Sequence, residues 1–163
     1  MISVKKIQHK ACSESILNKI CSIKALNWKY SVEKQLKWIE ENLHESDIHL
    51  LLELDSSPIA YANLVAVTAM INNREQLVYG IGNVCTSVKG MGYGNLIMQE
   101  INSAVKDLKQ PGILFCRSEL INYYKKFGWK LIAPPKISPK LPNTLTFNLF
   151  EKIESFSYTG KNF

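Results

Sequence analysis

A strand, a cluster of glycines, a helix and a second strand follow one another between residues 76 and 116, and this order constrains the fold most strongly. "QLVYGIGNVCT" (76–86) is rich in β-branched and aromatic residues, and "GILFC" (112–116) is too short for a helix. Apolar side chains recur between them at helical spacing, at Ile97, Ile101, Ala104, Val105 and Leu108. Because parallel neighbours need a crossover connection, the order predicts a parallel crossover within the sheet.

The remaining elements are predicted from periodicity, caps and turns. A strand is expected at 2–8, and two helices should begin after the capping residues Ser13 and Ser31, the second with a buried stripe at Val32, Leu36, Ile39 and Leu43. Three successive strands, 47–54, 59–71 and 76–86, suggest an antiparallel meander. A helical segment at 118–127 stops at Gly128, and closing strands are expected at 129–132 and 144–153.

The predicted order is therefore β-α-α-β-β-β-α-β-α-β-β. This order indicates a mixed α/β (α+β) fold with a mainly antiparallel central sheet and helices on both faces. With 163 residues and no linker or repeat, the chain is expected to form one domain over residues 1–163.

Composition and charge narrow the class of protein. Hydrophobic residues make up 46% and charged residues 21%, as in soluble globular domains. The net charge of +6 comes from scattered lysines rather than a dense basic stripe, so a small anionic ligand is as compatible as nucleic acid. Neither a signal peptide nor a membrane span is recognisable, which predicts a cytoplasmic protein without membrane contact. Its four cysteines and three histidines follow no metal-binding spacing, so we expect reduced thiols and no metal.

The glycine cluster suggests an anion-binding loop. Gly90, Gly92 and Gly94 give GxGxG, which fits neither the P-loop nor the dinucleotide-binding pattern. Glycines let successive backbone N–H groups turn toward one side, and the helix that follows adds free N–H groups and the positive end of its dipole. A diphosphate fits such a site, although a strand-to-helix turn without a ligand is the alternative.

Two segments resemble motifs of the GCN5-related N-acetyltransferase (GNAT) superfamily. "KGMGYG" looks like its pyrophosphate loop, with Lys89, Gly92 and Gly94 at the motif positions. "NYYKKFGWKL" resembles its Tyr-x-x-x-Gly-Phe/Trp segment, with Tyr124, Gly128 and Trp129 in register. The separation of the two motifs by one helix and one short strand, and the element order over nearly the whole chain, are also similar to the family's.

The resemblance implies acetyl-CoA as co-substrate, with no metal. Its pyrophosphate would lie over the backbone of residues 90–95, and its pantetheine arm would pair with the end of the strand at 84–86. Arg117 stands where many family members have asparagine, and Lys89 where arginine or glutamine is usual. The implied cofactor-binding residues are Val84, Cys85, Thr86, Lys89, Gly90, Met91, Gly92, Tyr93, Gly94, Asn95 and Arg117.

The resemblance also implies direct attack of an amine on the thioester. A backbone N–H near Val84 or Cys85 would stabilise the oxyanion, and Tyr124 would act as general acid toward the departing thiolate. The general base is unassigned; Glu53, Glu75 and Glu119 are candidates, acting through water. A ping-pong mechanism through Cys85, with Cys116 nearby, is the alternative, but no histidine lies close in sequence and both cysteines fit buried core positions better.

The leading hypothesis is therefore an acetyl-CoA-dependent N-acetyltransferase acting on a primary amine of a small molecule or peptide. By family architecture the acceptor would lie between "LNWKYSV" (26–32) and "APPKISPKLPN" (133–143), against Trp28, Tyr30 and Phe127. A catalytically silent CoA-binding or sensing module is the alternative. Nucleic acid is not expected as a partner, and both a monomer and a homodimer are open.

Overall fold

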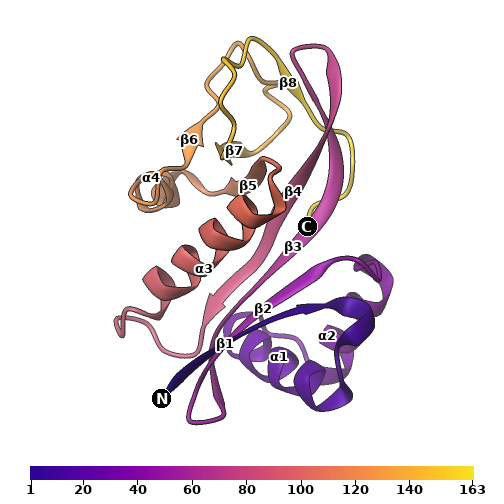
Figure 1. Ribbon diagram of the computed structural model, residues 1–163, viewed down its shortest axis with the longest axis vertical. Helices are drawn as coiled ribbons and strands as arrows, with labels where there is room; N and C mark the ends of the chain where they lie inside the picture. Colours follow the sequence, from indigo (N-terminus) through magenta and orange to yellow (C-terminus); the bar gives the residue numbers. More distant parts are fainter.

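The computed structural model describes residues 1–163, which form one central sheet flanked by helices (Figure 1). The strands are β1 (Ile2–Gln8), β2 (Ile48–Leu54), β3 (Ser57–Ile71), β4 (Arg74–Thr86), β5 (Gly112–Cys116), β6 (Lys130–Leu131), β7 (Asn143–Phe147) and β8 (Phe156–Ser157). The helices are α1 (Glu14–Asn27), α2 (Val32–Asn42), α3 (Tyr93–Leu108) and α4 (Ile121–Lys125), with short 3₁₀ turns η1 (His9–Ala11) and η2 (Ser118–Leu120). This order agrees with the predicted one and adds η1, η2 and β8.

The sheet is mixed and mainly antiparallel, as predicted. The strands lie in the order β1-β2-β3-β4-β5-β7-β6, and β8 pairs with β3. The β4–β5 pair is parallel, and α3 provides the crossover between them. Tight turns at Asp55–Ser56 and Asn72–Asn73, with positive φ at all four residues, join β2 to β3 and β3 to β4. Both turns fall where the sequence predicted them.

Helices cover both faces of the sheet. Leu51 of β2 packs with buried residues of α1 and α2, whereas its neighbours Leu50 and Leu52 pack with α3 on the other face. This alternation follows from the two-residue period of a strand. Figure 1 shows α1 and α2 together beside β2, α3 in front of β4, and α4 at the left beside β6. Ser13 and Ser31 cap α1 and α2 as expected, each accepting a hydrogen bond from a backbone N–H three residues on.

Two local predictions were wrong, and one short strand was not predicted. The last predicted strand ends at Phe147 because Asn148 adopts a positive φ of 61°, which breaks the extended backbone. The chain then returns as β8, where Phe156 is buried opposite Ile71. In α2, Val32 is 41% exposed and Gln35 takes a buried position instead.

A buried polar chain links η1 to the sheet beneath α1. His9 Nδ1 lies 3.0 Å from His49 Nε2, and His49 Nδ1 lies 2.8 Å from the Tyr61 hydroxyl. Both His49 and Tyr61 are fully buried. Burial, followed by the nearby His9 and Lys24, lowers the pKa of His49 from 6.5 to about 4. The folded protein therefore keeps His49 neutral at pH values where the unfolded chain protonates it.

We expect acid to destabilise the fold through His49. Between pH 6.5 and 4 the unfolded chain binds the extra proton, so the free energy of unfolding should fall as pH falls, by up to about 1.4 kcal/mol per pH unit. His49→Gln should show a shallower fall than the wild type in denaturant titrations across this range. His44→Gln, a change at an exposed histidine, is the control. Parallel pH profiles for wild type and His49→Gln would contradict this assignment.

Candidate functional site

The two parallel strands separate at their carboxyl ends. Their ladder has three residue pairs and ends at Ile81 and Leu114, although β4 continues to Thr86 and β5 to Cys116. Beyond the ladder, no strand pairs with β4 on the β5 side. Such an edge offers peptide groups to an extended ligand.

A β-bulge in β4 lies at the point of separation. Tyr61 pairs with Cys85 and Asn63 with Gly82, so Asn83 and Val84 together oppose one residue of β3. Asn83 has a φ of 53°, a left-handed conformation that asparagine tolerates better than most residues. Bulges bend the strand and increase its local twist. The bulge therefore bends β4 where its pairing with β5 ends.

The glycine loop presents a row of free backbone donors. Gly90 and Gly92 have φ values of 82° and 77°, and Gly92 is the N-cap of α3. No backbone N–H from Val88 to Gly94 donates to a protein acceptor, and the loop from Val88 to Gly92 is exposed. A Cβ atom on either glycine would meet nothing within 4 Å, so their requirement is conformational. These donors at a helix N-terminus suit an anion.

Tyr124 lines a cavity of about 300 Å³ in the gap between β4 and β5. Val84 and Phe115 contribute its strand walls, and Phe163 lies across it, with its ring stacked on that of Phe115. Gly80 and Gly82 of β4 let Phe163 approach, since a Cβ on either would overlap it. Burial, then Cys116 and Tyr123, raise the pKa of Tyr124 to about 12, so its phenol is protonated at neutral pH.

Tyr123 lies on a different side of α4 from the cavity. Its hydroxyl would lie 2.8 Å from a Cβ atom on Gly94, so α4 packs against the first turn of α3. This contact brings the two motif segments together, although they are far apart in sequence.

The other predicted residues have contrasting environments. Val84 packs on the α3 side and Cys85 on the α1–α2 side. Burial raises the pKa of Cys85 to about 12 and that of Cys116 above its usual value, so neither thiol is activated as a nucleophile. The Thr86 carbonyl already accepts a hydrogen bond from Asn27. Exposed positions are taken by Lys89, Met91, Asn95 and Arg117.

The carboxylates considered as bases have other surroundings. Glu53 is buried, and although burial opposes its charge, hydrogen bonds from Lys19 and Lys5 hold its pKa below the usual range. Glu119 is paired with Arg117 at 3.4 Å. Glu75 lies at the opposite end of β4, beside the turn from β3. None of the three lines the cavity between β4 and β5.

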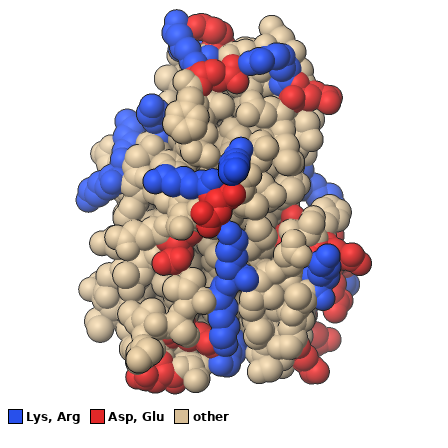
Figure 2. Space-filling model, viewed as in Figure 1, with Lys and Arg blue, Asp and Glu red and all other residues tan.

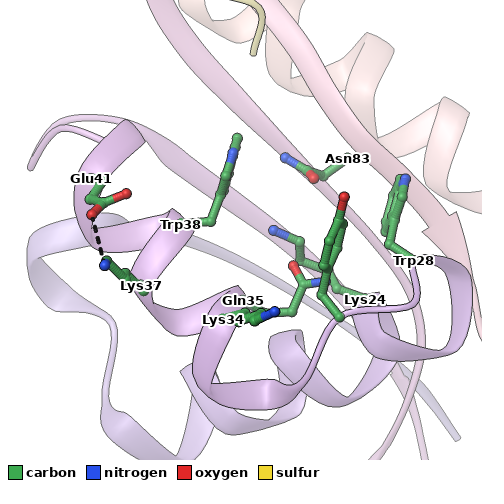
Figure 3. Close-up of a pocket in the computed structure, with 9 residues that line it drawn as sticks. Lys24, Trp28, Lys34, Gln35, Lys37, Trp38, Glu41 and Asn83 are labelled. Atoms are coloured by element: carbon green, nitrogen blue, oxygen red, sulfur yellow. Dashed lines mark ion pairs between the residues drawn. The ribbon is translucent and has the colours of Figure 1, made fainter.

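A second cavity, of about 390 Å³, lies beneath the connection between α1 and α2 (Figure 3). It adjoins the Tyr124 cavity because Trp28 and Asn83 line both. Its lining residues are Lys24, Trp28, Tyr30, Lys34, Gln35, Lys37, Trp38, Glu41 and Asn83. Trp28 and Tyr30 line this cavity, whereas Phe127 and the 133–143 loop, which were expected beside them, do not. Phe127 instead packs against Tyr123 on the α3 side.

Lys24 is the unexpected residue of this second cavity. It is 1% exposed, and its Nζ lies 4.2 Å from the ring centroid of Trp38. Burial lowers its pKa from 10.5 to about 8, against the weaker effects of Cys21 and Cys85. The sequence carried a signal for it: Lys24 follows the buried Ile20 by four residues, and so lies on the apolar face of α1.

Charges are mixed over the face of the molecule shown in Figure 2. Lysine and arginine side chains alternate with acidic ones instead of filling one continuous patch. No helix combines the length and the apolar character needed to cross a membrane.

The architecture defines the class of fold. A mixed sheet whose single parallel pair separates beside a glycine-rich helix start, with a Tyr-x-x-x-Gly-Trp segment packed against it, is the arrangement that the two motifs predicted. The chain has the fold of the GCN5-related N-acetyltransferases.

Comparison with known proteins supports the fold assignment. No protein-family model and no curated protein matches the sequence. The structure is similar to that of Escherichia coli ElaA, with a TM-score of 0.64 and 18% identity over 90% of this chain and 99% of that chain. It is also similar to an acyl-CoA N-acyltransferase from Pseudomonas aeruginosa, with a TM-score of 0.65 and 17% identity over 90% of this chain and 99% of that chain. A third similar structure is a GNAT family acetyltransferase from Brucella melitensis in complex with acetyl-CoA. Its TM-score is 0.62, with 15% identity over 98% of this chain and 96% of that chain.

We expect Lys24→Met to stabilise the protein at pH 7. The lowered pKa corresponds to a cost of about 3 kcal/mol for keeping the charge buried, and loss of the contact with Trp38 offsets part of the gain. Thermal and denaturant unfolding should therefore show a gain of about 1–3 kcal/mol. This gain should shrink as pH rises from 8 to 10.5, because folded wild-type Lys24 loses its proton there. Lys34→Met, at an exposed lysine of the same cavity, is the control, and a less stable Lys24→Met would overturn the prediction.

Proposed function

We propose that the protein is an acetyl-CoA-dependent N-acetyltransferase that acts on a primary amine of a small molecule or peptide. One observation carries the proposal: the unpaired end of β4 lines the same cavity as Tyr124, and Tyr123, the residue before it, packs against Gly94 at the end of the loop with free N–H groups. The similar structures from Pseudomonas aeruginosa and Brucella melitensis, described as an acyltransferase and an acetyltransferase, support it.

The residues at the edge of the sheet fit CoA. The N–H groups from Val88 to Gly94 have no protein acceptor, and Lys89 adds a positive charge beside them, which together suit a diphosphate. The separated part of β4 can pair with the amides of an extended arm through its main chain. Acetyl-CoA supplies an acyl group activated as a thioester. Because the Thr86 carbonyl is taken by Asn27, we place the pairing at the backbone around Val84 and Cys85.

Tyr124 is the proposed general acid. Its phenol stays protonated at neutral pH because burial raises its pKa to about 12, and it faces the gap between the strands. It can therefore donate its proton as a thiolate departs, within a concerted step. Backbone N–H groups beside the bulge at Asn83 can donate to the oxygen that gains negative charge. Phe115 and Phe163 exclude water from one side of the cavity.

The raised pKa of Cys85 favours direct attack of the amine on the thioester over a mechanism with an acyl-cysteine intermediate. The pKa of Cys85 is raised to about 12, so this thiol is a poor nucleophile at neutral pH. We assign no protein base, because none of the carboxylates considered from the sequence lines the Tyr124 cavity.

We expect Tyr124→Phe to lower kcat by about 10²- to 10⁴-fold, since general acid catalysis contributes about this much. CoA affinity, measured by calorimetry, should be nearly unchanged because the glycine loop is intact. The assay is thiol release from acetyl-CoA with a panel of amines. Tyr79→Phe, at a tyrosine packed on the α3 side of β4, is the matched control. Unchanged kcat in Tyr124→Phe would remove the acid role, and bound CoA with no turnover in the wild type would indicate a binding module.

We expect Gly92→Ala to weaken CoA binding by about five- to thirtyfold, as a strain of about 1–2 kcal/mol at positive φ predicts. The strained loop would relax and turn its N–H groups away from the anion. Calorimetric titration with CoA measures the effect. Asn73→Ala places a similar strain in the β3–β4 turn and should leave the affinity unchanged. Equal CoA affinity in Gly92→Ala and wild type would show that the loop does not hold the cofactor.

A further inference from the structure

The cavity beneath the α1–α2 connection contains a buried cation without an anionic partner. Lys24 makes no ion pair, and the one carboxylate that lines the cavity, on Glu41, is paired with Lys37 at 3.8 Å. Elsewhere the chain neutralises a buried charge: Glu53 has two lysine partners within 2.6 Å. A buried charge without a partner destabilises a fold, so the missing anionic partner of Lys24 is best explained by a ligand that binds there.

A second unpartnered donor lines the same cavity. Gln35 of α2 is 4% exposed, and its Nε2 is buried without a hydrogen-bond acceptor. Buried polar groups in native proteins are nearly always hydrogen-bonded, which makes such a group informative. Figure 3 shows Lys24 and Gln35 among the side chains around the cavity. An ammonium and an amide N–H₂ group together select an acceptor that bears negative charge.

The rest of the cavity wall is largely aromatic. Trp28, Tyr30 and Trp38 contribute ring surface, which suits an apolar or aromatic group. Trp28 and Asn83 also border the Tyr124 cavity, so a molecule in the second cavity can reach the gap between β4 and β5. Its volume of about 390 Å³ suits a small ligand.

We infer that this cavity binds the amine acceptor, and that the acceptor is an amino acid or similar amine that carries a carboxylate on an apolar body. The role of the ligand as acceptor rests on the proposed function, but the carboxylate site is defined independently by Lys24 and Gln35. The carboxylate accepts hydrogen bonds from Lys24 Nζ and Gln35 Nε2, the apolar body lies against the three aromatic rings, and the amine points past Asn83 toward the acyl group. One cation and one planar amide match a monoanion better than a phosphate dianion.

The binding test needs neither CoA nor turnover. The probes are the N-acetyl derivatives of phenylalanine, leucine and methionine, each paired with its amide, which differs only in lacking the carboxylate. Calorimetry and the fluorescence of Trp28 and Trp38 report binding. At least one acid should bind about tenfold or more tightly than its amide, the difference expected from a hydrogen bond to a charged group. Inorganic phosphate should not displace it.

Two variants link the preference to the proposed donors. Lys24→Met should remove the preference for acid over amide, and Gln35→Leu should reduce it severalfold. Lys10→Met, which removes the same charge from the exposed turn η1, should leave the preference intact. Circular dichroism and thermal unfolding confirm that each variant is folded.

Several results would overturn the inference: equal affinities for acid and amide, an unchanged preference in Lys24→Met, displacement by phosphate, or no acid that binds below about 10 mM. Turnover distinguishes this failure from failure of the proposed function. Acetylation of neutral amines, with no preference for amino acids over their amides, would remove the carboxylate site and leave the acetyltransferase. Selective binding of acids without any thiol release would support the carboxylate site and remove the acetyltransferase function.

Discussion

The parallel pairing of β4 with β5 over three residue pairs is the constraint on which the rest of the site depends. A longer ladder would close the gap that Tyr124 faces and would occupy the backbone edge near Val84. The bulge at Asn83 bends β4 where the ladder ends, and the first glycine of the loop, Gly90, comes four residues after the end of β4. The early end of the β4–β5 pairing thus creates both the open edge of β4 and the place where the two cavities meet.

Two of the buried groups without polar partners, on Lys24 and Gln35, line one cavity, and a third, Asn63 Nδ2, belongs to a side chain whose oxygen accepts a hydrogen bond from Asn83 of the cavity wall. Glu53 and the His49–Tyr61 pair are buried with full polar partners, whereas Lys24 and Gln35 are buried without them. Burying a charge or a donor without a partner opposes folding. Because such groups gather around one cavity next to the strand separation, they are better explained by ligand recognition than by imperfect packing.

Most of the fold could be predicted because its signals are local. Serine caps, helical periodicity and asparagine turns each act within a few residues, and the strand–helix–strand order fixed the parallel pair. The motif residues Gly92 and Tyr124 were placed by resemblance, and the structure brings their segments together. By contrast, β8, the bulge at Asn83 and the approach of Phe163 depend on contacts between distant residues, which no short pattern contains. Lys24 and Gln35 did carry a local signal, since both lie on apolar helix faces, but their shared cavity exists only once α1 packs against α2.

The two halves of the site belong to opposite faces of the sheet and to different parts of the chain. The N–H donors proposed for the diphosphate of CoA come from the loop before α3. The walls of the second cavity come mainly from α1, α2 and their connection. Substitutions within residues 30–41 can therefore reshape the second cavity without changing a residue that lines the Tyr124 cavity. Proteins with this fold could therefore diverge in the ligand of the second cavity through changes in a single helical hairpin, while the glycine loop and the unpaired end of β4 stay the same.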